Sequence, residues 1–258
     1  MNLTQFIREG FVEIREHSGR TVLQTLGVIL GVASVVATLG MTSGMEARRQ
    51  QYFEESGGTR LVGVYNQPPS ELELTARQRA RMGLKLQDAE QIRQTIPGFD
   101  QVVAEIARRH RVRAGETEME LRITAIEPDF GRMRGLEMAS GRYLGAHDIE
   151  TCAAVVVIGS TRARELFGST DPVGQALTIG GERYTVVGVT KEKVFYWQKN
   201  DTYNAHEWLN RLVVVPITSY MKRHLPATED RIDELNLRLV SADAHEESRP
   251  ALERLLDS

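Results

Sequence analysis

The chain has 258 residues, with 32 Lys and Arg against 35 Asp and Glu, six His and one Cys. This length allows one large or two modest domains, and 41% hydrophobic with 26% charged residues exclude a wholly disordered chain. A net charge of -3 argues against a dedicated nucleic-acid-binding protein, which would carry a basic excess. One cysteine excludes an internal disulfide framework and a multi-cysteine zinc site.

The first twenty residues mix apolar and charged side chains. The apolar ones recur at roughly helical spacing beside a charged face, namely Phe6, Ile7, Gly10, Phe11 and Ile14. This pattern predicts an amphipathic helix over residues 1–20 that lies at a membrane surface.

No charged side chain occurs in residues 21–45. Twenty residues of helix rise about 30 Å, the thickness of a bilayer's hydrocarbon core, so we predict a transmembrane helix here. A cleaved signal peptide fits less well because the apolar run is too long. A buried helix of a soluble domain fits less well still, since such domains rarely hide so long an uncharged run. Arginines flank both ends equally and leave the orientation open.

Two G-x-x-x-G spacings fall in this helix, at Gly27 and Gly31 and at Gly40 and Gly44. Glycines four residues apart share one helix face and allow another helix to approach closely. These four residues are therefore candidate helix contacts. The alternative is that glycine is simply common in membrane helices.

Residues 46–258 have the pattern of an α+β domain, in which strands outnumber helices and the helices fall between strand pairs. We predict helices at 46–55, 87–95, 160–167 (with Ser160 as N-cap) and 248–256. Alternating or continuous apolar runs predict strands at 61–65, 102–113, 119–125, 153–158, 177–179, 183–189, 212–216 and 235–239. Turns are expected at Gly115-Glu116 and at Gly180-Gly181.

Motifs for chemistry are scarce. The chain has no P-loop, no dinucleotide-binding G-x-G-x-x-G and no G-x-S-x-G nucleophile elbow, and no two histidines stand three or four residues apart. His147, Asp148 and Cys152 are close in sequence, but a single cysteine beginning a buried strand is more often part of the core than a ligand. The basic run at 108–113 reads as a solvated strand face. We therefore expect no enzyme activity, no cofactor and no metal.

Both tryptophans lie in an aromatic segment at residues 195–208. Its rings alternate with polar residues, and the candidate interaction residues are Tyr196, Trp197, Tyr203 and Trp208. Such amphipathic rings suit a protein interface or a loop near the membrane. A long hairpin that packs its rings on its own domain is the alternative.

Several segments, in order, resemble MacB/FtsX-type ABC transporter permeases. RTVLQTLGVILGVASVVATLGM at 20–41 resembles the first membrane helix of that family. ITAIEPDFGRMRGLEMASGRYL at 123–144, VVVIGSTRARELFGSTDPVG at 155–174 and TIGGERYTVVGV at 178–189 are similar to successive segments of its core domain, as is the Val-x-x-Pro ending at Pro216.

The resemblance implies an extracytoplasmic core domain of two α+β lobes, periplasmic in a Gram-negative cell, over residues 46–258. It implies a cytoplasmic N-terminus, an inner-membrane location and no nucleotide site on this chain. The partners it implies are a separate ABC ATPase, a second permease copy or paralogue, membrane lipid and a periplasmic adaptor, with no nucleic acid. The implied function is to couple cytoplasmic ATP hydrolysis to export (efflux) or to lipoprotein or peptide handling.

The chain departs from this family in two respects. The aromatic segment at 195–208 looks longer than the family's usual loop between these strands. Family members continue into three further membrane helices, whereas this sequence ends at Ser258. We expect either a truncated product or a permease completed by another chain. The alternative function is a stand-alone, membrane-tethered binding or scaffold protein without transport. The substrate does not follow from the sequence.

Overall fold

The computed structural model describes residue 15 and residues 18–58, 60–66, 83–198, 200–241 and 244–256. Most of the predicted amphipathic helix at 1–20 therefore lies outside the described residues. The chain divides into two units, Met1–Gln51 and Tyr52–Ser258.

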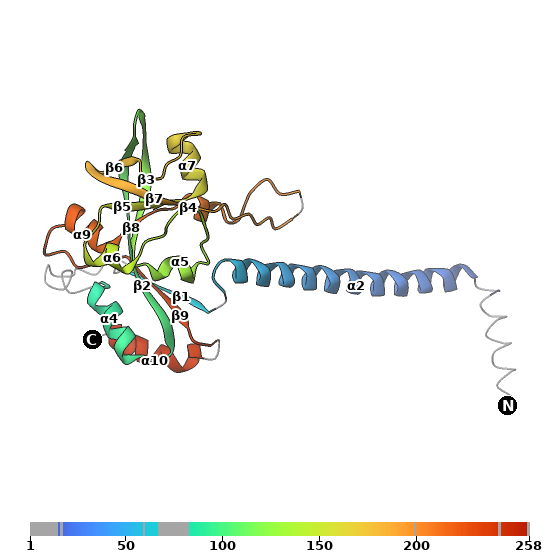
Figure 1. Ribbon diagram of the computed structural model, residues 1–258. Coiled ribbons are helices and arrows are strands. Elements are labelled where there is room, and N and C mark those ends of the chain that lie inside the picture. Colours follow the sequence, from blue (N-terminus) through green and yellow to red (C-terminus); the bar gives the residue numbers. More distant parts are fainter. Residues whose placement is uncertain are drawn as a thin grey trace, which may run out of the picture. The chain divides into compact units, whose positions relative to one another are not determined.

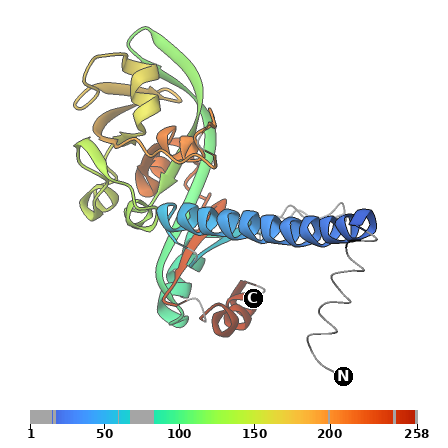
Figure 2. The same cartoon turned by 90° about the vertical axis from the view of Figure 1, so that its right-hand side faces the viewer.

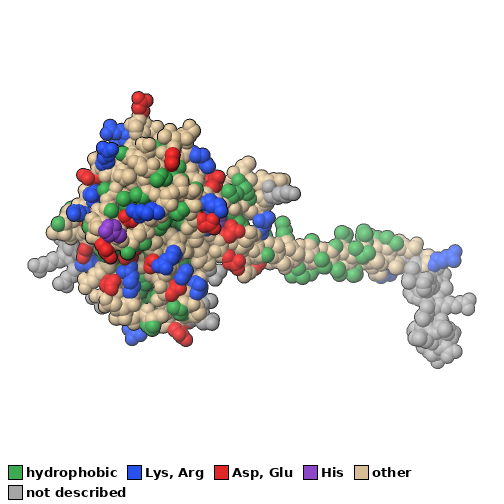
Figure 3. Space-filling view, in the orientation of Figure 1, with side chains coloured by type: hydrophobic (Ala, Val, Ile, Leu, Met, Phe, Trp, Pro, Cys, Tyr) green, Lys and Arg blue, Asp and Glu red, His purple; other side chains and the backbone are tan. Residues whose placement is uncertain are grey.

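The first unit consists, in its described part, of a long helix, α2 (Ser18–Glu55), whose last turn belongs to the second unit. It is a candidate membrane-spanning helix with a mean hydropathy of 2.1 in its most apolar window. Figure 3 shows hydrophobic side chains covering it. Its hydroxyls are satisfied inside the helix, because Thr25, Thr38, Thr42 and Ser43 each donate to a carbonyl four residues earlier at 2.8–2.9 Å. Such internal bonds are what a helix surrounded by lipid requires.

The second unit is built on one sheet of nine strands (Figure 1). Its strand order is β1-β9-β2-β3-β8-β5-β7-β4, and β6 pairs with both β2 and β7. The bounds are β1 Leu61–Tyr65, β2 Phe99–Ala114, β3 Thr117–Ile126, β4 Met138–Gly141, β5 Val155–Ile158, β6 Ala176–Ile179, β7 Glu182–Thr190, β8 Val213–Pro216 and β9 Glu234–Leu239. These strands confirm the eight that were predicted and add the short β4.

Both predicted hairpins are present. β2 and β3 pair antiparallel on either side of Gly115-Glu116, with Val112 opposite Met119. β6 and β7 pair across Gly180 and Gly181, whose φ angles are +56° and +94°. Positive φ at both central residues is typical of the type I′ turns that match strand twist.

Six strands of the sheet close into a ring. β2, β3, β8, β5, β7 and β6 follow one another, and the ring closes where Val112 and Arg113 of β2 pair with Ile179 and Thr178 of β6. The continuous apolar runs of β5 and β8 lie in this ring, and β8 is buried throughout. Their burial on both faces confirms the interpretation of those runs.

The helices divide the domain into two lobes. α4 (Leu86–Thr95) and α10 (Ala244–Leu256) lie together at the end that holds β1 and β9, whereas α7 (Ser160–Phe167) and α9 (Ile217–His224) cover the ring (Figures 1 and 2). The short helices are α5 (Asp129–Met133), α6 (Ala146–Glu150) and α8 (Glu207–Asn210). This arrangement confirms the predicted two-lobed α+β fold.

The sequence did not predict α5, α6, α8 and α9, and three local details also differ from the predictions. Ser160 is the first residue of α7 rather than its cap. Gly159 takes the cap position, where a Cβ would lie 2.2 Å from the Asn210 carbonyl oxygen. α10 begins at Ala244, four residues earlier than predicted. Asn236 is buried although its sequence position suggested a solvent-facing residue of β9, because it faces polar partners on other elements.

Candidate functional site: the end of the long helix and the aromatic segment

The last turn of α2 packs into the core domain through Tyr52. Its ring stacks on His206, with centroids 5.0 Å apart and planes 12° apart. The rings of Phe195 and Trp197 lie 5.3 Å and 5.0 Å from it. We call Tyr52, Lys193, Phe195, Trp197 and His206 the helix-end cluster. It joins the end of the long helix to the segment that the sequence marks as aromatic.

Lys193 supplies the polar part of this cluster. Its Nζ donates hydrogen bonds to the carbonyl oxygens of Glu55, at 2.6 Å, and of Arg134, at 3.0 Å. Glu55 is the last residue of α2, so the ammonium group caps the carbonyl end of the helix where positive charge is favourable. Burial lowers the pKa of Lys193, and the nearby Glu55 carboxylate opposes that shift.

A close-packed turn follows the helix. The NH of Gly58 donates to the Phe53 carbonyl at 2.7 Å. Gly57 has a φ of +119°, and a Cβ at this position would lie 2.2 Å from the Met133 carbonyl oxygen. Gly58 also has a positive φ, +93°, but a Cβ there would meet nothing within 4 Å. Only glycine therefore fits at Gly57.

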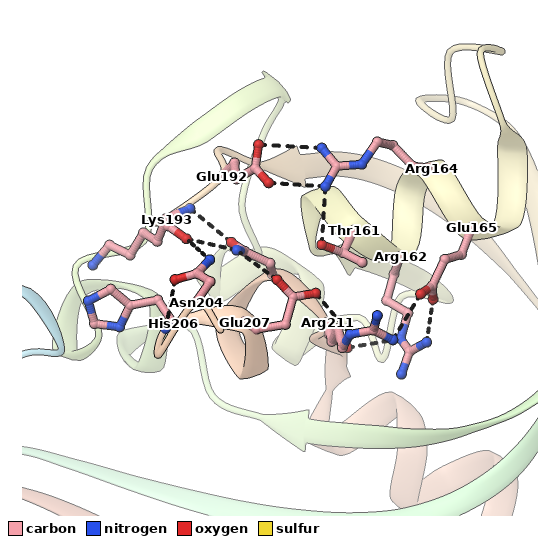
Figure 4. A network of polar contacts seen from close by, with 11 residues as sticks. Thr161, Arg162, Arg164, Glu165, Glu192, Lys193, Asn204, His206, Glu207 and Arg211 are labelled. Carbon is pink, nitrogen blue, oxygen red and sulfur yellow. Dashed lines mark hydrogen bonds and ion pairs between the residues drawn. The ribbon is translucent and has the colours of Figure 1, made fainter. Parts of the chain in front are cut away.

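The aromatic segment is an irregular loop ending in the short helix α8, so a long hairpin is wrong. Asn204 holds the loop together (Figure 4): its Oδ1 accepts from the backbone NH groups of Phe195 and His206 at 2.8 and 3.0 Å, and its Nδ2 donates to the Lys193 carbonyl at 2.7 Å. The NH of Ala205 donates to the Phe195 carbonyl at 2.8 Å and closes the base. The rings are thus presented on a hydrogen-bonded loop.

The four predicted interaction residues differ in their exposure and in the side chains they pack against. Phe195, which was not among them, is buried, while Tyr196, Trp197 and Trp208 are 39–40% exposed and Tyr203 is 68% exposed. Trp197 packs on Tyr52, and Trp208 lies under the Arg134 guanidinium at 5.4 Å. Part of the segment therefore packs on its own domain, and the role of the exposed rings in an interaction stays a prediction.

A groove of about 480 Å³ lies beside the helix-end cluster, lined in part by Tyr52, Tyr65, Arg134 and Trp208. Tyr65 of β1 and Glu234 of β9, which stand opposite each other, both line this groove, and Glu105 of β2 stands opposite Glu234 on its other side.

Two glutamates occupy paired positions at this groove, Glu234 in its lining and Glu105 on the neighbouring strand. Burial raises the pKa of Glu105, and the charge of Glu234 raises it further. Asn236 donates to the Glu105 carboxylate at 3.1 Å and accepts from Arg134 at 2.6 Å. Sequence reasoning missed this groove because its residues come from four separate segments.

A second cluster that the sequence did not reveal lies at the closure of the strand ring. The rings of His110 (β2) and His224 (α9) are 4.9 Å apart. His110 Nε2 lies 2.7 Å from the hydroxyl of Tyr220, and His224 Nε2 lies 3.0 Å from that of Tyr184. Both tyrosines are almost fully buried. Burial lowers the pKa of both histidines, and the charges of Arg108 and of His110 respectively lower it further.

These histidines give the domain an expected pH dependence. Because their folded pKa values lie below the unfolded value of about 6.5, stability is greatest above that pH and falls as the pH drops below it, by at most about 1.4 kcal/mol per pH unit for each histidine. The loss levels off below the folded pKa values. Replacing both His110 and His224 by Gln should reduce the difference in Tm between pH 7.5 and pH 5.5, measured by circular dichroism. The exposed His147→Gln variant serves as the control and should keep the wild-type difference.

The remaining sequence candidates lie elsewhere. Asp148 is bound at both carboxylate oxygens by Arg142, at 2.6 and 2.9 Å, and these hydrogen bonds hold its pKa below the usual range. Within the described residues, no group of three His, Cys, Asp or Glu side chains is placed to hold a metal ion. In the basic run, Arg109, Arg111 and Arg113 are exposed, as predicted for a solvated face.

Comparison with known proteins identifies related chains. Residues 21–255 match the family described as "MacB-like periplasmic core domain". The chain is 28% identical over 193 residues to the uncharacterized ABC transporter permease YknZ of Bacillus subtilis, covering 74% of this chain and 48% of YknZ. It is 29% identical over 236 residues to the macrolide export ATP-binding/permease protein MacB of Agrobacterium fabrum, covering 86% of this chain and 33% of that one.

Solved structures agree on the fold. The periplasmic region of MacB from Actinobacillus actinomycetemcomitans superposes with a TM-score of 0.61 at 17% identity, covering 80% of this chain and 86% of that one. The extracellular domain of YknZ gives a TM-score of 0.61 at 20% identity, covering 76% and 92%. The chain spans between a third and a half of the length of the two full-length relatives, YknZ and the Agrobacterium fabrum MacB.

Proposed function

Because the chain belongs to the family of MacB-like periplasmic core domains, we propose that it couples ATP hydrolysis by a partner subunit to export, or to lipoprotein or peptide handling. The domain is that of a MacB/YknZ-like ABC transporter permease, and the family is one of transporter components rather than of classical enzymes. No catalytic residue on this chain is part of the proposal.

The observation that carries the proposal is the attachment of the long helix to the core domain. α2 is one continuous helix, and its last turn is held by Tyr52 stacking and by the Lys193 bonds to the helix end. A displacement of such a helix end is passed to the packed side chains around it, since protein interiors are close-packed and resist compression. We infer that the helix-end cluster transmits motion between helix and domain.

The topology belongs to the same proposal. Residues 1–20 would lie at the cytoplasmic face, residues 21–45 would span the inner membrane, and residues 46–258 would lie in the periplasm or outside the cell. The proposed partners are a separate ABC ATPase, a second permease copy or paralogue, and a periplasmic adaptor. The substrate class stays open between macrolide-like compounds, peptides and lipoproteins.

Co-purification tests this function. The chain, tagged at its N-terminus at its native locus, is solubilised from membranes in mild detergent, and the bound proteins are identified by mass spectrometry. An ABC ATPase subunit recovered in stoichiometric amount supports the proposal. Recovery of the membrane-anchored chain without any ATPase would contradict it and favour the stand-alone scaffold.

The glycines of α2 are proposed as helix contacts. A Cβ at Gly27, Gly31, Gly40 or Gly44 would meet nothing within 4 Å, so these positions leave room for a neighbouring helix. Replacing Gly27 and Gly31 by Leu should weaken association in a membrane two-hybrid assay by about tenfold, which is about 1.4 kcal/mol. Val32→Phe with Leu39→Phe adds bulk on a helix face away from both glycine pairs and should change little. Equal association of both double variants would remove the glycines from the interface.

A further inference from the structure

Three rings of the aromatic loop keep a large exposed fraction. Tyr196 and Trp197 are 39% and 40% exposed and Tyr203 is 68% exposed, and Val194 at the start of the loop is 51% exposed. The loop is held by the Asn204 bonds and by a bond from the Gln198 NH to the Asp201 carboxylate at 2.8 Å. An ordered loop that keeps large rings exposed gains their burial only when something else covers them.

The exposed side chains are Trp and Tyr, and these residue types indicate what kind of surface covers them. Trp and Tyr have an apolar body and a hydrogen-bonding end, and they are enriched at the headgroup level of membranes. The described residues between Trp197 and Tyr203 are polar, so the loop combines amphipathic rings with groups that prefer water. Trp208 is not part of this surface, because it packs with Arg134 beside the groove.

The contact between this loop and α2 indicates that the loop lies near the lipid. Trp197 packs 5.0 Å from Tyr52, which lies in α2. Met45, the last residue of the uncharged stretch, precedes Tyr52 by seven helical residues, which is about 10 Å along the helix axis. A headgroup layer is about 5–8 Å thick on each side, so Tyr52 lies a few Å beyond its outer edge, within the length of a side chain that packs against it. Glu46, Arg48 and Arg49 fall in this interval, as expected for the headgroup level.

We propose that the loop formed by residues 196–198 and 200–203 lies in the headgroup region of the membrane that α2 spans, with Trp197 and Tyr203 as its lipid contacts. The proposal rests on the membrane anchoring in the proposed function. It assigns the core domain a lipid contact of its own, besides its tether. Such a contact would limit the tilt of the domain relative to the membrane plane.

Depth-dependent quenching of tryptophan fluorescence tests the proposal. The chain has two tryptophans, so Trp208→Phe leaves Trp197 as the single probe in the full-length chain. This variant is placed in phosphatidylcholine nanodiscs that carry a nitroxide either on the headgroup or deep on the acyl chain. We expect the headgroup label to quench Trp197 at least about twofold more than the deep label does.

Two matched variants distinguish a failure of the lipid contact from a failure of the membrane anchoring. In a background without Trp197 and Trp208, Val35→Trp reports on the centre of α2 and should be quenched by the deep label. Glu116→Trp, on the turn between β2 and β3, should be quenched by neither. If Val35→Trp is quenched and Trp197 is not, the lipid contact is wrong and the exposed rings serve a protein partner instead. If Val35→Trp is not quenched, the anchoring and the lipid contact both fail. Equal headgroup quenching of Trp197 and Glu116→Trp would also overturn the loop assignment.

Discussion

Replacing Gly57 by alanine is expected to destabilise the core domain by about 3 kcal/mol and, under the proposed function, to abolish transport by the permease to which the chain contributes. Two effects add at this position. A non-glycine residue at φ +119° is strained, and the new Cβ would lie 2.2 Å from the Met133 carbonyl oxygen. The backbone must move to relieve this contact, and the turn that follows α2 moves with it. Unfolding by denaturant, followed by tryptophan fluorescence, measures the first effect, and export into membrane vesicles measures the second.

The neighbouring glycine provides a matched control. Gly58 also has a positive φ, +93°, but a Cβ there would meet nothing within 4 Å. Gly58→Ala should therefore show only the conformational strain, about 1 kcal/mol, and keep most of the transport activity. If Gly57→Ala and Gly58→Ala behave alike, close packing of the turn is not what joins the helix to the domain.

Replacing Lys193 by methionine should cost about 2 kcal/mol of stability. The Nζ bonds to the Glu55 and Arg134 carbonyl oxygens are lost, and methionine keeps most of the apolar volume. Burying the charged ammonium group is itself unfavourable, as its lowered pKa shows. The substitution removes this unfavourable burial, so the net loss is smaller than the energy of two charged hydrogen bonds. Transport should fall further than stability does, since the lost bonds hold the end of α2.

Lys191 is the control for this variant. Its Nζ lies 2.9 Å from the Glu137 carboxylate, and both side chains are largely exposed, at 65% and 71%. Exposed ion pairs contribute little, so Lys191→Met should leave the stability nearly unchanged. An equally small effect of Lys193→Met would exclude Lys193 as the residue that holds the helix end.

Much of the fold follows from local pattern. The alternation of apolar and polar residues along β3 predicts its two faces, and Gly180-Gly181 between two apolar runs predicts a tight turn. The uncharged stretch within α2 predicts a membrane helix in the same way. These signals lie within a few residues of one another, so the sequence by itself determined eight of the nine strands, the longer helices except α9, the fold class and the family resemblance.

The partners of the functional side chains depended on the tertiary structure. Lys193 and Glu55 are 138 residues apart in the chain, and His110 and Tyr220 are 110 apart. Asn236 stands in an alternating strand as if exposed, yet it is buried because Arg134 and Glu105 reach it from other elements. A periodic pattern reports which side of a strand or helix is buried, but not which distant segment buries it. Only the closure of the strand ring and the packing of the helix end decided those pairings.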